Sequence, residues 1–477
     1  MYRIAYPEDD VFLQSDLVRT AQADPKLRQL HDRVQAVCAD ARVRLALRHD
    51  LAATPTAVTT GAPALPAFVS VGLAVVRRLM GWGYRTVEGE VKVSAGWRWV
   101  GGLFGEAMPN FRTIQNREAK LKPKTIRLIN AVVVQLGHRL GVTTAQKLRV
   151  DSSVTETNIH YPTDSRLLDD AARVLSRLVR QVRQVRPPRT AAEKAWYRDR
   201  HRQAHHLARQ IGQLAGQQTK NTEKSSAKLY ATLLNVVEAL LAQVDQLQPR
   251  LASVTDPSAL ALTEAFAHYV PLVKQVVAQT RQRVLKHIAV PASDKIVSLF
   301  EPQSAIICRG KPKPKETEFG RKVWYAEVDG GLISEYRLLD GNPPDEPLLL
   351  PSLQHHQQLF GKVPREVSGD RKIFSARNEQ EARALGVRRV SLPKPGHPSA
   401  RRRRREHAPW FRAAQRFRNG IEGRLSQLRR ARRLERCLNH GPLGMDRWLG
   451  WGVIANNLAT IALNLIKRHL SPAEALR

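Results

Sequence analysis

Apolar positions in the first third of the chain recur at intervals of three and four residues, as they do on one face of an α-helix. Helical runs of this kind fill residues 11–60 and end in the loop-like ATPTAVTTGAPALP. A second helix is predicted from Phe68 to the Gly-Trp-Gly of residues 81–83, and a third opens at Asn110. Short helices with basic exposed faces are typical of a helix-turn-helix-like DNA-binding unit, but a plain helical packing domain has the same spacing.

The period changes to two at KLRVDSSVTET. Leu148, Val150 and Val154 lie on one face of this stretch, and Asp151 lies with polar neighbours on the other. The alternation predicts a strand with Asp151 on its polar face.

Helical spacing returns from Ser165 to about Val290. The polar tract GQQTKNTEKSSAK separates the first part of this region from a leucine-rich helix at residues 229–247. We expect a helical hairpin or bundle that is inserted into a larger domain and serves as a spacer or a dimerisation arm.

Strand signals reappear in the second half of the chain. Residues 322–329 and 332–340 are joined by Gly-Gly, which is a hairpin signal. The elements that follow are a helix in EPLLLPSLQHHQQLFG, a strand ending at Asp370, a helix in NEQEARALG, a strand in VRRVSLP, a loop in PKPGHPSARRRRRE and a long basic helix from about Ala408.

This order of elements predicts an α/β fold with a ribonuclease H-like catalytic domain, in which a mixed sheet is flanked by helices. An all-helical N-terminal DNA-binding domain and the helical insertion complete the expected architecture. The expected domains are 1–60 as an N-terminal helical segment, 61–145 as the DNA-binding domain, 146–164 with 291–440 as the catalytic domain, 165–290 as the insertion, and 441–477 as a C-terminal helix that packs on the catalytic domain.

Charge narrows the choice of partner. The chain has 477 residues and an ordinary apolar fraction of 42%, but its net charge is +34 and its pI is near 10.9. Such a surface attracts polyanions, with nucleic acid as the first candidate and an anionic membrane as the second. Charge alone supports a nucleic-acid partner and does not indicate an activity.

The cysteine pattern and the apolar segments bear on the compartment. Cys38, Cys308 and Cys437 lack CxxC spacing, which argues against a disulfide framework and fits a reducing compartment. The N-terminus has no signal-peptide layout. Residues 448–466 are apolar but interrupted by asparagines, and no second segment resembles them, so we expect a buried helix, no membrane partner and a cytoplasmic protein.

Three acids stand where the predicted fold would gather them: Asp151 on a strand, Asp370 at a strand end, and Glu422 in an arginine-rich helix. Such carboxylates can hold two Mg²⁺ ions, which prefer oxygen ligands and clamp a reacting phosphodiester. Gly420 and Gly423 flank Glu422, and because each glycine costs about 1 kcal/mol in a helix, we expect a close approach of other groups there.

Four stretches carry a resemblance to a known family: RVDSSVTETNIHYPTDSRLL, GDRKIFS, RFRNGIEGRLSQL and WLGWGVIANNL. They resemble the DDE transposases of bacterial insertion sequences, most closely the ISNCY-like group, over nearly the whole chain. The resemblance implies that Asp151, Asp370 and Glu422 form the catalytic triad. It also implies two bound Mg²⁺ ions, with Mn²⁺ as a substitute, and no small-molecule cofactor.

The resemblance further implies that the protein cuts double-stranded DNA at the element ends and joins the freed 3'-hydroxyl to target DNA. Residues 60–145 would recognise the terminal repeats, and a homodimer on DNA would bring two ends together at the bacterial nucleoid.

A family signature falls on Gln415, Arg418, Glu422 and Arg429, which share one helix face and place both arginines beside the metals as phosphate contacts. Tyrosine would be usual at the first of these positions, and Lys372 replaces a glycine usual after GDR. The basic run, expected to be a mobile DNA-binding segment, consists of Arg401, Arg402, Arg403, Arg404 and Arg405.

Two alternatives stay open. A nuclease of the same fold would cleave DNA without joining it, and a decayed transposase would be a non-enzymatic DNA-binding protein. The pairs His201 with His205 and His355 with His356 lack cysteines or acids at ligand spacing in the sequence, so we do not assign them metals.

Overall fold

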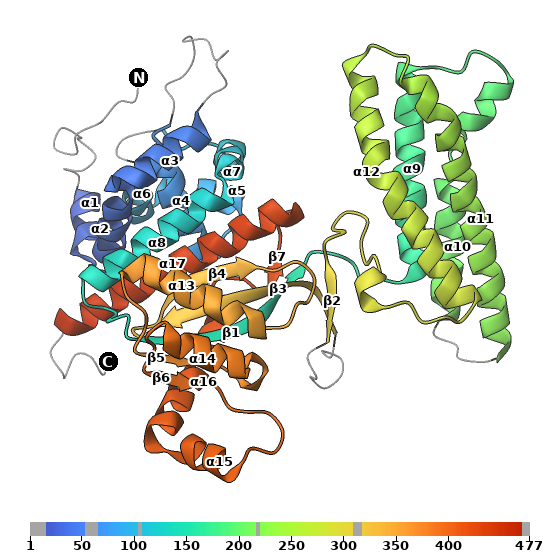
Figure 1. Ribbon diagram of the computed structural model, residues 1–477. Coiled ribbons are helices and arrows are strands. Elements are labelled where there is room, and N and C mark those ends of the chain that lie inside the picture. The colour runs from blue at the N-terminus through green and yellow to red at the C-terminus, as the bar shows by residue number, and fades with distance from the viewer. Residues whose placement is uncertain (1–15, 53–64, 104–106, 216–219, 309–316, 470–477) are drawn as a thin grey trace. The chain divides into compact units, whose positions relative to one another are not determined.

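The computed structural model describes residues 16–52, 65–103, 107–215, 220–308 and 317–469. By its internal contacts the chain divides into two units, Met1–Glu156 with Lys322–Arg477, and Thr157–Arg321 (Figure 1). The second unit therefore interrupts the sequence of the first. The loop expected at residues 53–66 lies mostly outside the described residues, as does the N-terminal stretch that was inspected for a signal peptide.

Short helices open the first unit. They are α1 Asp16–Ala23, α2 Pro25–Ala39, α3 Ala41–Leu51, α4 Ala67–Met80, α5 Tyr84–Val93, α6 Ala95–Gly101, α7 Phe111–Lys120 and α8 Pro123–Arg139. The Asn110 side chain accepts a hydrogen bond from the Thr113 amide at 2.9 Å and caps α7. α4 ends at Gly81, whose φ of 67° lies in the left-handed region that glycine tolerates. Both helix boundaries agree with the sequence prediction.

A mixed sheet has most of its strands in this unit, and by the same division its residues 305–308 and 317–321 belong to the second unit. Its strands are β1 Lys147–Thr157, β2 Ala305–Cys308, β3 Thr317–Val328, β4 Leu332–Leu338, β5 Glu366–Ser368, β6 Arg389–Ser391 and β7 Arg436–Cys437. They are ordered β2-β3-β1-β5-β6, with β4 also on β3 and β7 on β1. β1, β5 and β6 run parallel, whereas β3 and β4 form the predicted antiparallel hairpin.

The orientation of β3 against β1 follows from hydrogen bonds at their ends. The Asp329 amide donates to the Lys147 carbonyl at 3.2 Å, so the end of β3 lies beside the start of β1. At the other end, the Thr157 hydroxyl donates to the Phe319 carbonyl at 3.3 Å. The two strands are therefore antiparallel, and β1 is the strand at which the sheet changes direction.

The remaining helices of this unit follow the hairpin. They are α13 Leu349–Phe360, α14 Ala376–Ala384, α15 Ala400–His407, α16 Pro409–Ala431 and α17 Gly441–His469. α14 and α16 lie where helices were predicted, but the predicted loop at residues 393–406 is wrong in its second half, where α15 forms. The Ser399 side chain caps α15 by accepting from the Arg402 amide, and arginine is a good helix former.

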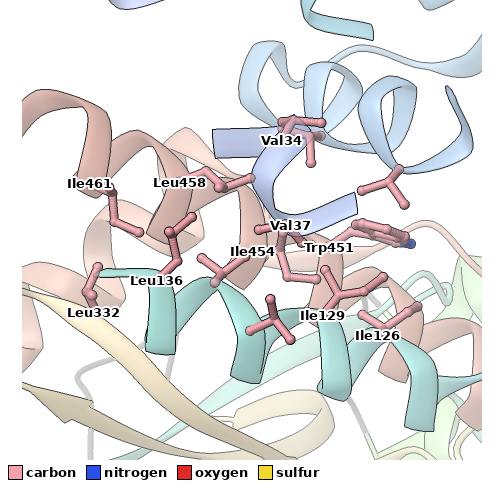
Figure 2. Packing of buried hydrophobic residues seen from close by; sticks show 14 of the residues in the cluster. Val34, Val37, Ile126, Ile129, Leu136, Leu332, Trp451, Ile454, Leu458 and Ile461 are labelled. Carbon is pink, nitrogen blue, oxygen red and sulfur yellow. The ribbon is translucent and has the colours of Figure 1, made fainter. Parts of the chain in front are cut away.

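Alternate residues of β3 enter different cores, because successive side chains of a strand point to opposite faces. Trp324 belongs to the larger core, together with apolar residues of α2, α4, α8 and α17. Val323 and Tyr325 belong to the smaller core, with residues of α16 and the first turns of α17. Figure 2 shows the larger core, where Val37, Ile129, Leu332 and Ile454 meet from α2, α8, β4 and α17.

The N-terminal helices thus share one continuous core with the sheet. α17 packs on α2, α4 and α8 as well as on β4 and α16. The sequence analysis had placed these helices in a DNA-binding domain of their own and α17 on the catalytic domain. The apolar spacing identifies a buried helix face but not the element that covers it.

One asparagine of α17, Asn457, is held by a buried hydrogen-bond network. Asn457 is fully buried, donates to the Asn130 side chain and the Ile333 carbonyl at 2.9 Å each, and accepts from the Ile333 amide. This network joins α17, α8 and β4, and it satisfies polar groups that would be costly if buried without partners.

Two helices of the described chain are long and apolar enough to cross a membrane by composition, Glu223–Leu251 and Gly441–Arg468. The most apolar window of the second is 72% buried, as expected for the predicted core helix, and that of the first is 44% buried. The statement that no second segment resembles residues 448–466 was therefore incomplete.

The second unit is helical and has its own core. Its main helices are α9 Asp164–Val185, α10 His201–Leu214, α11 Lys220–Leu251 and α12 Pro257–Thr280. Phe266 is fully buried among leucines and valines of α9, α11 and α12. The described part of the polar tract predicted to separate helices, from Lys220 onward, instead belongs to α11, because lysine, alanine and glutamate favour a helix.

Candidate functional site

Asp151 is the fifth of the eleven residues of β1, on the face predicted from the sequence. Its side chain is 15% exposed and accepts hydrogen bonds from the Ser152 amide at 2.8 Å and from Arg418 at 3.1 Å. Burial, together with the smaller effect of the charges of Asp370 and Asp345, raises the pKa of the Asp151 carboxyl to about 6. Arg418 and the Ser152 amide oppose this shift without cancelling it.

Asp370 follows β5, which is the parallel neighbour of β1. The register pairs Leu148 with Val367 and Arg149 with Ser368. Asp151 and Asp370 each come two residues after the Arg149–Ser368 pair. The parallel register therefore brings the two acids to adjoining positions on neighbouring strands. Asp370 accepts a hydrogen bond from the Lys372 amide at 2.9 Å and caps a short turn, which forms despite the lysine there.

Glu422 approaches from α16. Its side chain is 67% exposed and accepts a hydrogen bond from Arg418 at 2.9 Å. Arg418 is only 13% exposed and joins Glu422 to Asp151 with its two terminal nitrogens. The structure thus holds two of the three predicted acids, Asp151 and Glu422, on one guanidinium. Within the described part of the chain, however, the three carboxylates do not form a group whose ligand atoms all lie within 4.8 Å of one another.

A fourth acid, Asp345, was missed by the sequence analysis. It is buried, accepts from the Ser152 hydroxyl at 3.0 Å and pairs with Lys322 at 2.8 Å. It lies in the turn-rich DGNPPDEP, where an acid is ordinarily a turn former. Only the fold, which brings this loop beside β1, shows that Asp345 contributes negative charge near Asp151.

α16 is fixed to the sheet by a buried ion pair. Glu327 on β3 is fully buried and receives Arg149 through both oxygens, at 2.8 and 2.6 Å, while Arg424 of α16 adds a contact at 3.2 Å. Arg149 also donates to the Phe417 carbonyl of α16. The sequence offered one signal for this pair, namely an acid inside the otherwise apolar KVWYAEV.

The glycines beside Glu422 differ in their surroundings. A Cβ added at Gly420 would collide with the guanidinium of Arg149, so the close approach predicted there is confirmed. A Cβ added at Gly423 would meet nothing within 4 Å, so the same prediction is wrong for that position. Gly420 makes room for the arginine that ties α16 to β1 and β3.

The remaining signature positions also lie on α16. Gln415 donates to the Ser391 carbonyl at 2.9 Å and to the Gly369 carbonyl at 3.4 Å, which holds α16 at the ends of β6 and β5. Arg429 contacts Glu435 at 3.4 Å. Gln415 therefore anchors the helix beside Asp370.

The basic run forms helix α15 and is not a mobile loop. Arg402 donates to both oxygens of Glu379 at 2.8 Å and to Glu406 at 2.7 Å, and Arg405 donates to Glu379 at 3.3 Å. These two arginines are held within the fold. The other three, Arg401, Arg403 and Arg404, are exposed.

A strongly basic cavity of about 570 Å³ lies beside α15. It is lined by Arg383, Arg388, Arg389, Ser399, Arg401, Arg402, Arg405 and Trp410. A cavity with such a lining suits a phosphate-bearing ligand, and an aromatic ring offers a surface on which a base can stack.

Of the adjacent histidines His355 and His356, the second has a structural role. His356 is buried, its Nε2 lies 3.0 Å from the Ala145 carbonyl, and burial lowers its pKa to about 4. It is therefore neutral at physiological pH and holds α13 against the start of β1.

Comparison of the chain with protein-family models, curated proteins and solved structures finds no match. The site is therefore interpreted from its own geometry.

Proposed function

We propose that this chain is a DNA transposase of the DDE type, which acts on double-stranded DNA by metal-dependent phosphoryl transfer. The observation that carries the proposal is the pairing of Arg149 with Ser368, which sets Asp151 beside Asp370 at one sheet edge. The strand arrangement supports a ribonuclease H-like assignment, because β1 has an antiparallel hairpin on one side and two short parallel strands on the other.

The donor chemistry of the acids fits Mg²⁺. Asp151, Asp370 and Glu422 supply only carboxylate oxygens, which hard divalent cations prefer. Burial raises the pKa of Asp151 although Arg418 opposes the shift, so a bound cation would further stabilise the ionised carboxylate. Two Mg²⁺ ions, with Mn²⁺ as a substitute, would supply an activated attacking oxygen and a stabilised leaving oxygen.

Arg418 holds Asp151 and Glu422 in the structure. Arg418 occupies one oxygen of each acid, so both oxygens of an acid become available to a metal ion only when Arg418 releases it. A released guanidinium beside the acids would then contact a phosphate of the strand being cut, as the signature position implies. Arg149 and Glu327 keep α16 in register with β1 during this exchange.

The DNA path that we propose combines two basic surfaces. The exposed arginines of α15 and the adjoining cavity would bind phosphates near the site without reading sequence. α7 exposes Arg112, Gln115 and Asn116 on one side, and these residue types read base edges. Recognition of the element ends would fall to this helix and its neighbours, and two protomers would pair the two ends at the nucleoid of a bacterial cytoplasm.

The experiment uses labelled duplexes that cover the DNA on either side of the coding sequence, with the purified protein and Mg²⁺ or Mn²⁺. The wild type should cleave at an element end and then join the 3'-hydroxyl to a target plasmid. Asp151→Asn, Asp370→Asn and Glu422→Gln should each reduce both products at least about a hundredfold while retaining DNA binding. Glu381→Gln, which changes an exposed acid on α14, should leave both products unchanged.

Each other outcome has a meaning. Cleavage without joined products would support a nuclease of the same fold and contradict the transposase. DNA binding without cleavage in either metal would support a decayed enzyme in which Arg418 keeps the acids permanently paired. Cleavage that survives all three acid substitutions would contradict the proposed site.

A further inference from the structure

A second cluster of metal-binding side chains lies in the helical unit, away from the acids discussed above. His201 and His205 are one turn apart on α10, so they share a face, and Asp169 faces them from α9. The sequence gave the histidines no acidic partner, because Asp169 is more than thirty positions earlier in the chain, on another helix.

The three side chains converge on a small space. His205 Nδ1 lies 2.9 Å from Asp169 Oδ2, and His201 Nε2 lies 3.5 Å from Asp169 Oδ1. One ligand atom from each residue lies within 4.8 Å of the others, and among the described residues this is the only such group of three. The imidazole rings have centroids 5.9 Å apart and are tilted by 52°.

Hydrogen bonding does not fully account for this arrangement. Asp169 Oδ1 is buried and has no hydrogen-bond partner within the described structure. A buried carboxylate oxygen without a partner is costly, and a bound cation would satisfy it. The side chains remain reachable from solvent, with His201 34% and His205 64% exposed, so an ion has a path to the site.

We propose that Asp169, His201 and His205 bind one divalent transition-metal ion, with Zn²⁺ as the preferred occupant. Two imidazoles and one carboxylate form a mixed nitrogen and oxygen donor set that suits Zn²⁺, whereas Mg²⁺ prefers oxygen alone. Three protein ligands leave a fourth position for water or for a ligand from outside the unit. The ion would connect α9 to α10 and stabilise their packing.

This site is independent of the proposed reaction, since it uses none of the acids at the edge of the sheet. The simpler reading is a hydrogen-bonded pair between a histidine and an aspartate. That reading explains His205 but not the convergence of a second imidazole on the remaining carboxylate oxygen.

The test measures binding of Zn²⁺ and Co²⁺ to the full-length protein carrying Asp151→Asn, so that the acids of the sheet edge contribute less to the signal. Calorimetry should find one tight Zn²⁺ site per chain, and bound Co²⁺ should give the visible absorption typical of a tetrahedral site with nitrogen ligands. Excess Mg²⁺ should displace neither ion.

Variants decide which residues hold the ion. Asp169→Asn, His201→Gln and His205→Gln should each weaken Zn²⁺ binding by at least about tenfold and abolish the Co²⁺ absorption. His206→Gln changes the exposed neighbour of His205 and should bind as the parent does. Circular dichroism confirms that each variant is folded. Absence of stoichiometric binding in the parent, or equal binding in all four variants, would overturn the proposal.

Discussion

The Asp151 carboxyl carries an electrostatic cost that its neighbours in the fold do not relieve. Its folded pKa of about 6 lies above the usual value of 3.8. The folded state therefore binds this proton more tightly than the unfolded state does. Stability from this group is fully present below pH 4 and is lost as the pH rises through 6. The difference of about two pKa units corresponds to roughly 3 kcal/mol.

Asp151→Asn should therefore stabilise the protein against urea in EDTA at pH 7, by up to about 3 kcal/mol, and by much less at pH 4. The other carboxyls titrate in the same way in the wild type and the variant. The change in the stability difference between pH 7 and pH 4 therefore reports on Asp151 alone. Added Mg²⁺ should stabilise the wild type and not the variant. A variant that is less stable than the wild type at pH 7 would show that the ion pair with Arg418 outweighs the burial cost.

Gly420 and Gly423 form a matched pair on one helix. Alanine is about 1 kcal/mol better than glycine inside a helix, so Gly423→Ala, which meets open space, should stabilise the protein by up to that amount. Gly420→Ala should destabilise it by about 1 to 3 kcal/mol, because the new methyl displaces Arg149 from Glu327 and Phe417. Urea denaturation of both variants checks this, and equal effects would contradict the role assigned to Gly420.

Helix α15 concentrates like charges, and its stability depends on an acid from another element. Glu379 of α14 pairs with Arg402 and Arg405, and its side chain is 15% exposed. Glu379→Ala leaves both guanidinium groups without this partner and should cost about 2 kcal/mol or more. Glu381→Ala removes an exposed pair with Arg377 on the same helix and should cost no more than about 0.5 kcal/mol.

The sequence predicted most elements of the sheet and its helices, because periods of two and of three to four survive wherever one face is buried. Through element order it placed Asp151 on the polar face of one strand and Asp370 at the end of another, and it predicted that the fold brings them together. It did not predict α15, because a run of arginines in one short helix is destabilised by charge repulsion unless an acid from another element, here Glu379, pairs with it. Asp345 and Glu327 were missed for the same physical reason, as their partners come from distant segments.

The helical unit has a hydrophobic core of its own, separate from the core that the N-terminal helices share with the sheet. Phe266 is fully buried in the helical unit, and Phe→Ala in a core costs about 3 to 5 kcal/mol. Phe266→Ala should therefore raise amide hydrogen exchange in helices α9 to α12 and leave exchange in the sheet unchanged. Trp324→Ala, in the core of the sheet, should have the reverse effect. Equal loss of protection in both units would show that they unfold as one.

The placement of α17 determines when the core of the N-terminal helices can be completed during translation. Val34 and Val37 pack against Trp451 and Ile454, so the first helices to leave the ribosome need a partner that is translated about 400 residues later (Figure 2). At about 5 to 20 residues per second, their apolar faces wait roughly 20 to 80 s. A product that stops before α17 lacks one wall of this core. A prematurely terminated chain would therefore be bound by chaperones and degraded by proteases, and it would not persist as a shortened folded protein.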